Sequence, residues 1–523
     1  MTARALMILG TASHAGKSIL TAGLGRILAD DGYRVAPFKA QNMSLNSAAT
    51  PDGREIGRAQ ALQAEACRVP ACAEMNPVLI KPSTDTGAQI VLLGRVWGQV
   101  TAADYHTHRV EELFPVVLES YRKLASQYDV MVLEGAGSPA EINLREHDIV
   151  NMRMARAANA ACLLVGDIDR GGVFAALVGT LELLEPWERA LIRGFVINKF
   201  RGDQTLLRPG VEMIERRLGL PCVGVVPFLH DLGLDEEDGV AIEERRTAGR
   251  AWKGLDGGAS PERPLRIGVI ALPHMSNFTD FDALAAEPSV ALAYLERAEE
   301  LPHADLLTLP GSKQTLDDLE WLHRRGMTPL VHEHHARKAG VIGICGGFQM
   351  LGARIEDPHG IENNGQPCAR EGLGLLPVRT ILHTKKITRP VRGRVRSQAW
   401  KQTAFRGYEI HVGETVLLDG AAPFAEIVPG GADGAMSADG LVFGTYVHGI
   451  FDDDLFRHAF LDAARAACGL APARDKAFVT AERDARLDRL AAHLRRSLDM
   501  DLIRSWVGPP PSGPHSERAG GPK

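Results

Sequence analysis

The chain has 523 residues, of which 45% are hydrophobic, and its 59 basic and 65 acidic side chains give a formal net charge of −6. This length exceeds what one hydrophobic core organises, so we expect two or three domains. No Lys/Arg block favours nucleic acid, no apolar run approaches the roughly 20 residues that cross a bilayer, and the N-terminus has no signal pattern. The seven scattered cysteines, an odd number, are typical of a reduced, cytoplasmic protein. We therefore expect neither a nucleic acid nor a membrane as partner.

Apolar, β-rich runs alternate with helical stretches over residues 1–230. This alternation predicts a doubly wound α/β domain, in which helices cover both faces of a parallel sheet. The runs lie at 5–9, 34–38, 130–133, 161–165, 194–197 and 223–226.

A glycine-rich loop follows the first of these runs. It begins with Gly10 and Thr11, ends with Gly16, Lys17 and Ser18, and precedes a helical pattern. Its glycines are six positions apart (16 − 10 = 6), one more than in the standard P-loop, but the Gly-Lys-Ser ending and the strand–loop–helix setting are intact. Backbone N–H groups of such a loop bind phosphate, the lysine adds positive charge, and the serine hydroxyl is a Mg²⁺ ligand. The loop predicts an ATP site; the alternative is a glycine-rich turn with an accidental lysine.

Acidic residues follow two of the predicted strands. Glu134 ends the run at 130–133, and Asp167 comes shortly after the run at 161–165. An acidic residue at the carboxyl end of a parallel strand lies in the ligand crevice of this fold class. With Ser18, both are candidate Mg²⁺ ligands, Glu134 the stronger, and helix capping is the alternative for either. Glu55 is a further, weaker candidate.

Asn198 and Lys199 end the run at 194–197. In folds of this kind the nucleotide base is often bound at this position. A turn with two polar surface residues is the alternative.

Residues 231–264 differ from their surroundings, being acidic and then charged and glycine-rich, and we interpret them as a linker. A second α/β series, predicted over 265–470, opens with apolar runs at 266–272 and 304–311. From about 373 to 448 the pattern becomes rich in β-formers and glycine.

The C-terminal part, 471–503, is predicted to be helical. Within it, residues 481–503 indicate one amphipathic helix, because leucines recur at helical spacing at 487, 490, 494 and 498. The tail 504–523 is rich in Pro, Gly and Ser and is expected to be disordered.

A thiol follows a short apolar strand at 341–344. Gly343, Cys345 and Gly347 have the G-x-C-x-G spacing of a nucleophile elbow, and a helical pattern comes next. The glycines suit a strained, crowded turn, and a thiol beside a helix N-terminus is favoured as thiolate. Cys345 is therefore a candidate nucleophile; the alternative is a buried structural cysteine.

A cysteine nucleophile needs a base. His448 ends a β run before a glycine about a hundred residues later, and it is the candidate to take the thiol proton and return one to the leaving amine. A histidine on a strand is otherwise often structural. The tight turn at Gly311 is suited to donate a backbone N–H to an oxyanion, with the N–H of Gly346 as the second donor.

A histidine cluster at 332–335 suggests a metal site. A zinc helix of the HExxH type would need a histidine at 336, where the chain has Ala336, so the cluster predicts a solvated helix instead.

Together these motifs resemble a known family. A P-loop domain with the longer glycine spacing, joined to a C-terminal Cys/His elbow domain, is similar to the cobyrinate amidotransferases and their dethiobiotin-synthetase-like ATPase relatives. Within that group the chain resembles the cobyric acid synthase type over nearly its whole length. The strings that carry the resemblance are PFKAQNMSLNS (37–47), EIGRAQALQAEA (55–66), NPVLIKP (76–82), DTGAQIVLLG (85–94), DIDRGGVFA (167–175), NKFRGD (198–203), SNFTDFDAL (276–284) and GYEIHVG (407–413).

The resemblance implies a dethiobiotin-synthetase-like P-loop domain followed by a class I glutamine amidotransferase-like domain. It also implies amidation of four peripheral carboxylates of adenosylcobyrinic acid a,c-diamide, with one glutamine and one ATP used per amide. Cys345 would release ammonia through a thioester, and the ammonia would displace phosphate from an acyl phosphate made with ATP and Mg²⁺ in the other domain. Substrate contacts in QNMSLN and NFTDFD are implied by the resemblance alone.

One position departs from the glutaminase pattern. Classical triads place Glu two residues after the His, where this chain has Ile450, so the orienting third member stays open. Glu409 or His411 is a candidate to orient the site or to bind substrate. Two rival functions stay open as well: a cobyrinate a,c-diamide synthase, and a partition-ATPase-like switch with an inactive glutaminase module. The oligomeric state is not predicted.

Overall fold

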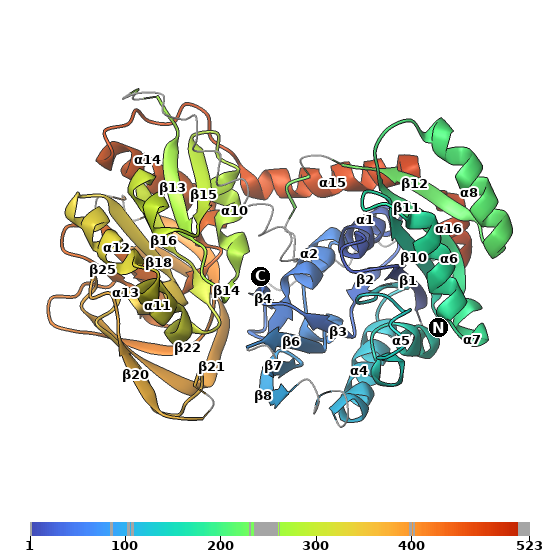
Figure 1. Cartoon of the computed structure of the whole chain (residues 1–523), viewed down its shortest axis with the longest axis horizontal. Coiled ribbons are helices and arrows are strands. Elements are labelled where there is room, and N and C mark those ends of the chain that lie inside the picture. Colours follow the sequence, from blue (N-terminus) through green and yellow to red (C-terminus); the bar gives the residue numbers. More distant parts are fainter. Residues whose placement is uncertain are drawn as a thin grey trace.

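Two lobes joined by a long C-terminal helix form the structure, a computed structural model (Figure 1). The described residues are 3–83, 87–101, 105, 109–229, 232–234, 260, 262–363, 365–396, 400 and 403–510. Most of the predicted linker, including its acidic run 235–238, and residues 511–523 of the predicted tail lie outside them.

A six-stranded parallel sheet organises the first lobe, in the order β12-β11-β10-β1-β9-β2. Its strands are β1 (Arg4–Gly10), β2 (Val35–Phe38), β9 (Val130–Glu134), β10 (Ala161–Asp167), β11 (Ile192–Phe200) and β12 (Cys222–Pro227). The helices of this lobe are α1 (Lys17–Asp30), α2 (Arg58–Ala66), α4 (Val110–Ala125), α5 (Met152–Ala158), α6 (Val173–Leu183), α7 (Pro186–Arg189) and α8 (Gln204–Leu218), with short 3₁₀ turns η1 (Ala73–Met75) and η3 (Arg145–His147).

Alternate side chains of β1 enter two different cores. Leu6 and Ile8 pack with α1, whereas Met7 and Leu9 pack with α4 and α5 on the opposite face. Both faces of the sheet are therefore covered, which confirms the doubly wound α/β class predicted from the alternating runs.

A second, smaller sheet in this lobe was not predicted. It has four strands, in the order β3-β6-β7-β8. In the sequence these strands lie between β2 and α4. Its strands are β3 (Gln41–Met43), β6 (Val78–Pro82), β7 (Gly87–Leu92) and β8 (Arg95–Thr101), and a separate pair is formed by β4 (Ser47–Ala49) and β5 (Glu55–Gly57).

The second lobe is built on a six-stranded sheet in the order β15-β13-β16-β18-β26-β25, parallel except for β25. This confirms the second predicted α/β domain. The strands are β13 (Leu265–Ile270), β15 (Val290–Leu295), β16 (Leu306–Leu309), β18 (Gly340–Ile344), β25 (Ala435–Met436) and β26 (Val442–Thr445). The helices are η5 (Phe278–Phe281), α10 (Asp282–Ala285), η6 (Ala298–His303), α11 (Thr315–Arg324), α12 (Met327–Ala336), α13 (Gly346–Leu351), η8 (Ile450–Asp452) and α14 (Asp454–Ala467).

The region predicted to be β-rich forms a second sheet around a long hairpin. Its antiparallel strands β21 (Val378–Val395) and β22 (Ala404–Leu417) pair along most of their length. The remaining strands are β19 (Arg354–Asp357), β20 (Cys368–Glu371), β23 (Ala425–Val428), β24 (Gly431–Asp433) and β27 (Val447–His448), and a two-stranded pair is formed by β14 (Met275–Ser276) and β17 (Gly311–Ser312).

The C-terminal region is two helices, not the one predicted over 481–503. α15 (Val479–Ser497) ends where Leu498 takes an extended conformation and forms a β-bridge with Gly224 of β12. α16 (Met500–Val507) then begins at Asp499, whose side chain accepts the N–H of Leu502. Four residues of the predicted disordered tail, 504–507, belong to α16, and Val507 is buried.

α15 crosses from the second lobe to the first (Figure 1). Its leucines pack into the core under α1, where a Cβ on Gly23 would lie 2.4 Å from Leu494. Arg26 of α1, which is 1% exposed, donates to Asp484 and Asp488 of α15. The C-terminal helices thus complete the core of the N-terminal lobe.

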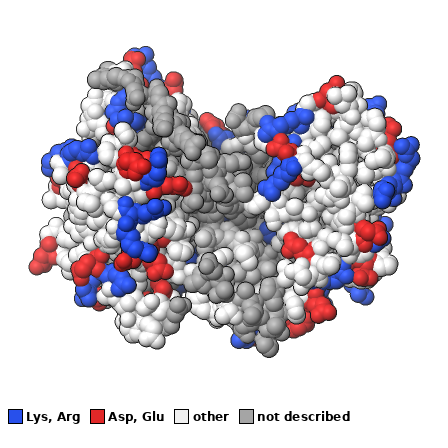
Figure 2. All heavy atoms as spheres, in the orientation of Figure 1, with Lys and Arg blue, Asp and Glu red and all other residues white. Residues whose placement is uncertain are grey.

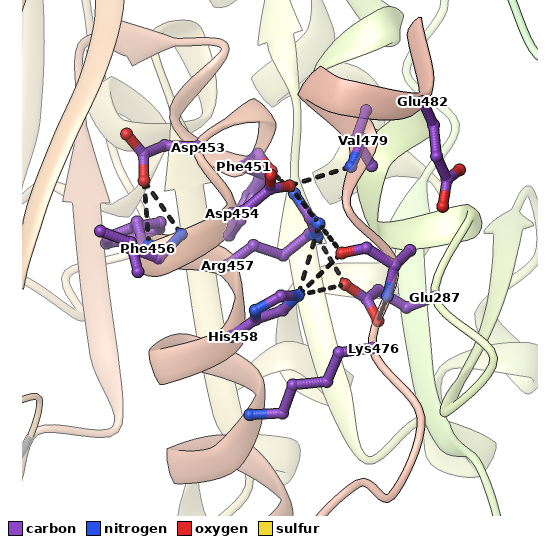
Figure 3. Close-up of polar contacts among 12 residues, drawn as sticks. Glu287, Phe451, Asp453, Asp454, Phe456, Arg457, His458, Lys476, Val479 and Glu482 are labelled. Atoms are coloured by element: carbon purple, nitrogen blue, oxygen red, sulfur yellow. Dashed lines mark hydrogen bonds and ion pairs between the residues drawn. The ribbon is translucent and has the colours of Figure 1, made fainter. Parts of the chain in front are cut away.

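The other end of α15 is anchored to the second lobe by Arg457, whose side chain is fully buried (Figure 3). It donates to Glu287 Oε1 at 2.6 Å, to Asp454 at 2.7 Å and to the carbonyl oxygen of Ala477 at 2.7 Å, just before α15 begins. A buried cation with this many partners fixes the segment that leads into α15.

Basic and acidic side chains are interspersed over both lobes on the face shown in Figure 2, as their near-equal numbers suggest. Within the part of the chain that the structure describes, every helix is too short or too polar to span a bilayer.

Candidate active sites

The predicted nucleophile elbow lies between β18 and α13. Cys345 has φ 51° and ψ −107°, a conformation that is strained for a residue with a Cβ. A Cβ on Gly343 would lie 2.6 Å from the backbone of Gly347, and one on Gly347 would lie 2.0 Å from the carbonyl oxygen of Leu309. The two glycines are therefore required for the turn to close on its neighbours.

His448 lies beside Cys345, and its surroundings favour the protonated imidazole. Its Nδ1 is 2.7 Å from Asp280 Oδ2, and Cys345 is close enough to shift its pKa. The Cys345 Sγ itself is 3.7 Å from the carbonyl oxygen of Ile410. Burial alone would lower the pKa of His448, but its interactions with the Asp280 carboxylate and with Cys345 raise it to about 10. The imidazole is therefore protonated at neutral pH, as a proton donor to a leaving amine must be.

Asp280 is the structure's candidate for the third member that the sequence left open. It lies on η5, is 3% exposed, and also accepts the N–H of Gly449 at 2.8 Å, so both of its oxygens fix the histidine loop. The sequence contained it in NFTDFD, but 168 residues separate it from His448 and no spacing rule links them.

The two other candidates for that role have different partners. Glu409 pairs with Arg389, while the Nδ1–H of His411 donates to the Gly413 carbonyl oxygen at 2.7 Å and its ring stacks on Tyr446. Both support the sheet under the elbow.

Gly311 and Gly346, the predicted oxyanion donors, flank this pair. A Cβ on Gly311 would lie 3.3 Å from His448 Cε1, and one on Gly346 would lie 2.8 Å from the backbone nitrogen of Ser312. Gly346 is the first residue of α13, where backbone N–H groups have no partner within the helix. The position of both residues fits the predicted role.

The P-loop of the first lobe is closed around its lysine. Lys17 Nζ donates to the carbonyl oxygens of Ala12 at 2.9 Å and Gly137 at 3.0 Å. Gly16 has φ 94°, and a Cβ there would lie 2.1 Å from Asn198 Nδ2, so only glycine fits.

Ser18 and Glu134, two of the three predicted Mg²⁺ ligands, are in direct contact. Ser18 Oγ donates to Glu134 Oε1 at 2.8 Å, and the ammonium of Lys39 lies 2.8 Å from the same oxygen. Burial alone would raise the pKa of Glu134, but Lys39 holds it below its usual range, so the carboxylate is charged. One carboxylate and one hydroxyl beside a phosphate-binding loop fit Mg²⁺, which takes few protein ligands and completes its shell with phosphate and water.

Asp167, the third predicted Mg²⁺ ligand, has a different partner from Ser18 and Glu134. Its carboxylate pairs with Lys199 at 3.0 Å. Lys199 also donates to the His14 carbonyl at 2.7 Å, and Asn198 donates to the Ala15 carbonyl at 2.9 Å. In this structure Asn198 and Lys199 support the P-loop, a role that the sequence did not suggest.

A cavity of about 980 Å³ adjoins the loop. Its lining includes Lys17, Ser18, Glu134 and Asp167, the β3 residues 41–43, and arginines from α5 and the segments around it. This size admits a nucleotide. Basic and acidic side chains line the cavity in similar numbers, and the ammonium groups of Lys17 and Lys39 lie beside the P-loop and Glu134.

Glu55 and the histidine cluster differ from their predictions. Glu55 is buried at the lobe interface, with Lys81 Nζ at 2.7 Å and Lys386 Nζ at 2.5 Å, and is not among the cavity residues. In α12, His334 is 1% exposed, and burial lowers its pKa to about 4, so this part of the cluster is packed, not solvated. Among the described residues no group of three or more His, Cys, Asp or Glu side chains is arranged to hold a metal.

Comparisons with known proteins match nearly the whole chain. Residues 6–242 match the CobQ/CobB/MinD/ParA nucleotide binding domain, and residues 266–456 match the CobB/CobQ-like glutamine amidotransferase domain. A protein named cobyric acid synthase from Nitratidesulfovibrio vulgaris is 48% identical, with 97% of this chain and 98% of that protein covered. Proteins of the same name from Moorella thermoacetica (47%, with 97% and 98% covered) and Salmonella heidelberg (49%, with 96% and 97% covered) are equally similar. A solved glutamine amidotransferase covers 38% of this chain and 98% of its own at 16% identity and a TM-score of 0.29, a likeness too distant to bear on the fold.

A nucleotide-binding domain and a glutamine amidotransferase domain in one chain define a glutamine-dependent amidating ligase. The chain belongs to the cobyric acid synthase family, whose amidation reaction is part of cobalamin biosynthesis.

Proposed function

We propose that this protein converts adenosylcobyrinic acid a,c-diamide to adenosylcobyric acid by amidating the b, d, e and g carboxylates. Each amide would consume one glutamine and one ATP and release glutamate, ADP and phosphate. The observation that carries the proposal is the 47–49% identity to proteins named cobyric acid synthase over 96–97% of the chain, which includes both sites.

The second lobe would supply the nitrogen. Cys345 Sγ attacks the side-chain carbonyl carbon of glutamine, and the backbone N–H groups of Gly311 and Gly346 stabilise the resulting oxyanion. His448 gives its proton to the departing nitrogen, so ammonia leaves and a thioester remains. Water, deprotonated by His448, then releases glutamate and regenerates the thiolate–imidazolium pair, while Asp280 keeps the ring in place.

The first lobe would activate the substrate carboxylate. A carboxylate does not react with ammonia, because its oxygen is a poor leaving group. Transfer of the γ-phosphoryl group of ATP to that oxygen gives an acyl phosphate and ADP, and ammonia then displaces phosphate to form the amide. Ser18 and Glu134 would hold Mg²⁺, which offsets phosphate charge when bound. Lys17, in the P-loop, and Lys39, beside Glu134, would stabilise the transferring phosphoryl group.

An amide count tests the proposal. The chain is incubated with the a,c-diamide, ATP–Mg²⁺ and glutamine, and the mass of the corrinoid product is measured by mass spectrometry. We expect four added amides. Conversion of cobyrinic acid itself would instead assign the chain to the a,c-diamide synthases, and no corrinoid product would favour a switch with an inactive glutaminase module.

A further inference from the structure

The two lobes contact each other around the Cys345–His448 site. Ser47 donates its N–H to Asn277 Oδ1 at 2.9 Å, and Phe278 donates its N–H to Asn46 Oδ1 at 3.2 Å. The two asparagines thus form a reciprocal pair, each accepting from the backbone beside the other. Asn46 is 2% exposed and Asn277 3% exposed, so both hydrogen bonds are shielded from water.

The pair acts on the element that carries Asp280. Asn277 precedes η5 and has φ 52°, a left-handed conformation that is uncommon for residues other than glycine. Phe278, which donates to Asn46, is the first residue of η5. Two hydrogen bonds from the first lobe therefore hold the start of the turn whose Asp280 orients His448.

The same segment of the first lobe also contacts Tyr408, a neighbour of the histidine. The carbonyl oxygen of Ser47 accepts from the Tyr408 hydroxyl at 3.1 Å. The Tyr408 ring stacks on the His448 ring, with centroids 5.6 Å apart and planes at 25°. Residues 46 and 47 consequently hydrogen-bond the start of the turn that carries Asp280 and also Tyr408, the stacking partner of the imidazole.

This segment is continuous with the wall of the nucleotide cavity. β3 lines the cavity with Gln41, Asn42 and Met43, and only Ser44 and Leu45 separate it from Asn46. Ser44 Oγ accepts a hydrogen bond from the N–H of Asn46 at 2.9 Å, so residues 44–46 form a tight turn between β3 and Asn46.

We infer that Asn46 is a positioning residue of the glutaminase site, and that segment 41–47 couples the nucleotide cavity to the Asp280–His448 pair. The inference rests on the proposed function. It assigns part of the glutaminase site to the first lobe, so that ammonia is released only when that lobe is in place to use it.

The test compares Asn46→Ala with Asn46→Asp, which keeps an oxygen to accept the Phe278 N–H. Leu124→Ala is the control for lost stability, since Leu124 is a buried residue of α4 that contacts no part of η5. For each we measure glutamine-dependent and ammonia-dependent amidation, and kcat/KM for glutamine hydrolysis against pH.

For Asn46→Ala we expect glutamine-dependent activity to fall roughly 10- to 100-fold, because small displacements of a catalytic group have such effects. Ammonia-dependent amidation should fall far less than glutamine-dependent activity, and the alkaline limb of glutamine hydrolysis should move to lower pH, because the His448–Asp280 contact is weakened. Asn46→Asp should recover most of the loss, and Leu124→Ala should keep the wild-type pH profile. An equal loss of both activities in Asn46→Ala, or an unshifted alkaline limb, would overturn the positioning role.

The coupling has its own measurement. Glutamine hydrolysis by the wild type should change several-fold when ATP–Mg²⁺ and the corrinoid are added, and by much less in Asn46→Ala. Identical rates in the wild type with and without these ligands would overturn the coupling. Neither result depends on which carboxylates are amidated, so the amide count tests the proposed function separately.

Discussion

Single residues hold the charges on which the glutaminase chemistry depends. The pKa of His448 is raised to about 10 because a carboxylate and a cysteine sulfur surround a buried ring. The sequence could predict Cys345 and His448, since each ends a strand before a glycine. It could not predict Asp280, because only the folded chain brings η5 beside β27.

Replacing Asp280 with Asn removes the charge that keeps His448 protonated. The pKa of His448 should fall, so the alkaline limb of kcat/KM for glutamine hydrolysis should move to lower pH. Glutamine-dependent activity should decrease roughly 10²- to 10⁴-fold. Ammonia-dependent amidation serves as the internal control and should persist; an unchanged alkaline limb would show that Asp280 does not set the charge of the ring.

The raised pKa of His448 also makes stability depend on pH. The folded value lies above the ordinary value of 6.5, so this group stabilises the fold fully below about pH 6.5 and its contribution is lost as pH rises toward 10. Asp280→Asn should therefore show a weaker loss of unfolding temperature than the wild type between pH 7 and pH 10.

Glu134→Gln tests the predicted Mg²⁺ site with little change of shape. Ser18 and Gln63 donate to different oxygens of Glu134, so the single amide oxygen keeps one of these two hydrogen bonds, and the ion and Lys39 lose their carboxylate. ATP-dependent amidation from ammonia should fall roughly 10²-fold or more, while hydrolysis of glutamine alone should be retained. Full activity of this variant with ammonia would remove Glu134 from the site.

At the scale of elements, short-range patterns were sufficient where one strand, one turn and one helix make the site. The P-loop and the elbow are of this kind, and both lie where the sequence placed them. In the small sheet from β3 to β8, which was missed, β3 is three residues long and polar and carries no strand pattern. The apolar residues of β6 and β7 could have indicated strands. The single helix predicted for 481–503 was wrong because helical spacing of leucines continues to Leu498, whereas that residue pairs with β12.

Gly347→Ala tests the packing of the elbow. Its Cβ would meet the Leu309 carbonyl oxygen at 2.0 Å, so β16 or α13 must move. We expect a loss of about 1–3 kcal/mol or more in unfolding free energy, together with loss of glutamine hydrolysis. The matched control is Gly179→Ala in α6, where a Cβ meets nothing within 4 Å; there the change should be neutral or slightly stabilising in calorimetry.

The whole molecule is two lobes that share helices and active-site supports. Leu494, far along the sequence from the P-loop, is 1% exposed in the core of the first lobe. The sequence assigned 471–503 to a separate segment because nothing local shows which lobe an amphipathic helix will cover. The lobe interface surrounds the glutaminase site, and no sequence pattern indicated this interface.

Leu494→Ala should destabilise the nucleotide lobe by about 2–5 kcal/mol through the cavity it leaves. Thermal unfolding followed with and without ATP–Mg²⁺ reports this lobe. Leu206→Ala is the control, since Leu206 is 82% exposed and its loss should change little. Equal unfolding temperatures for both variants would mean that α15 does not support the P-loop lobe.

Tracing the nitrogen atom tests the central claim most directly. The chain is given the a,c-diamide, ATP–Mg²⁺, amide-¹⁵N glutamine and unlabelled ammonium, and the product is examined by mass spectrometry beside that of Cys345→Ala. The wild type should place ¹⁵N in four amides, whereas Cys345→Ala should form the same amides only with unlabelled nitrogen. Incorporation of ¹⁵N by Cys345→Ala, or its absence from the wild-type product, would contradict the division of labour between the two lobes.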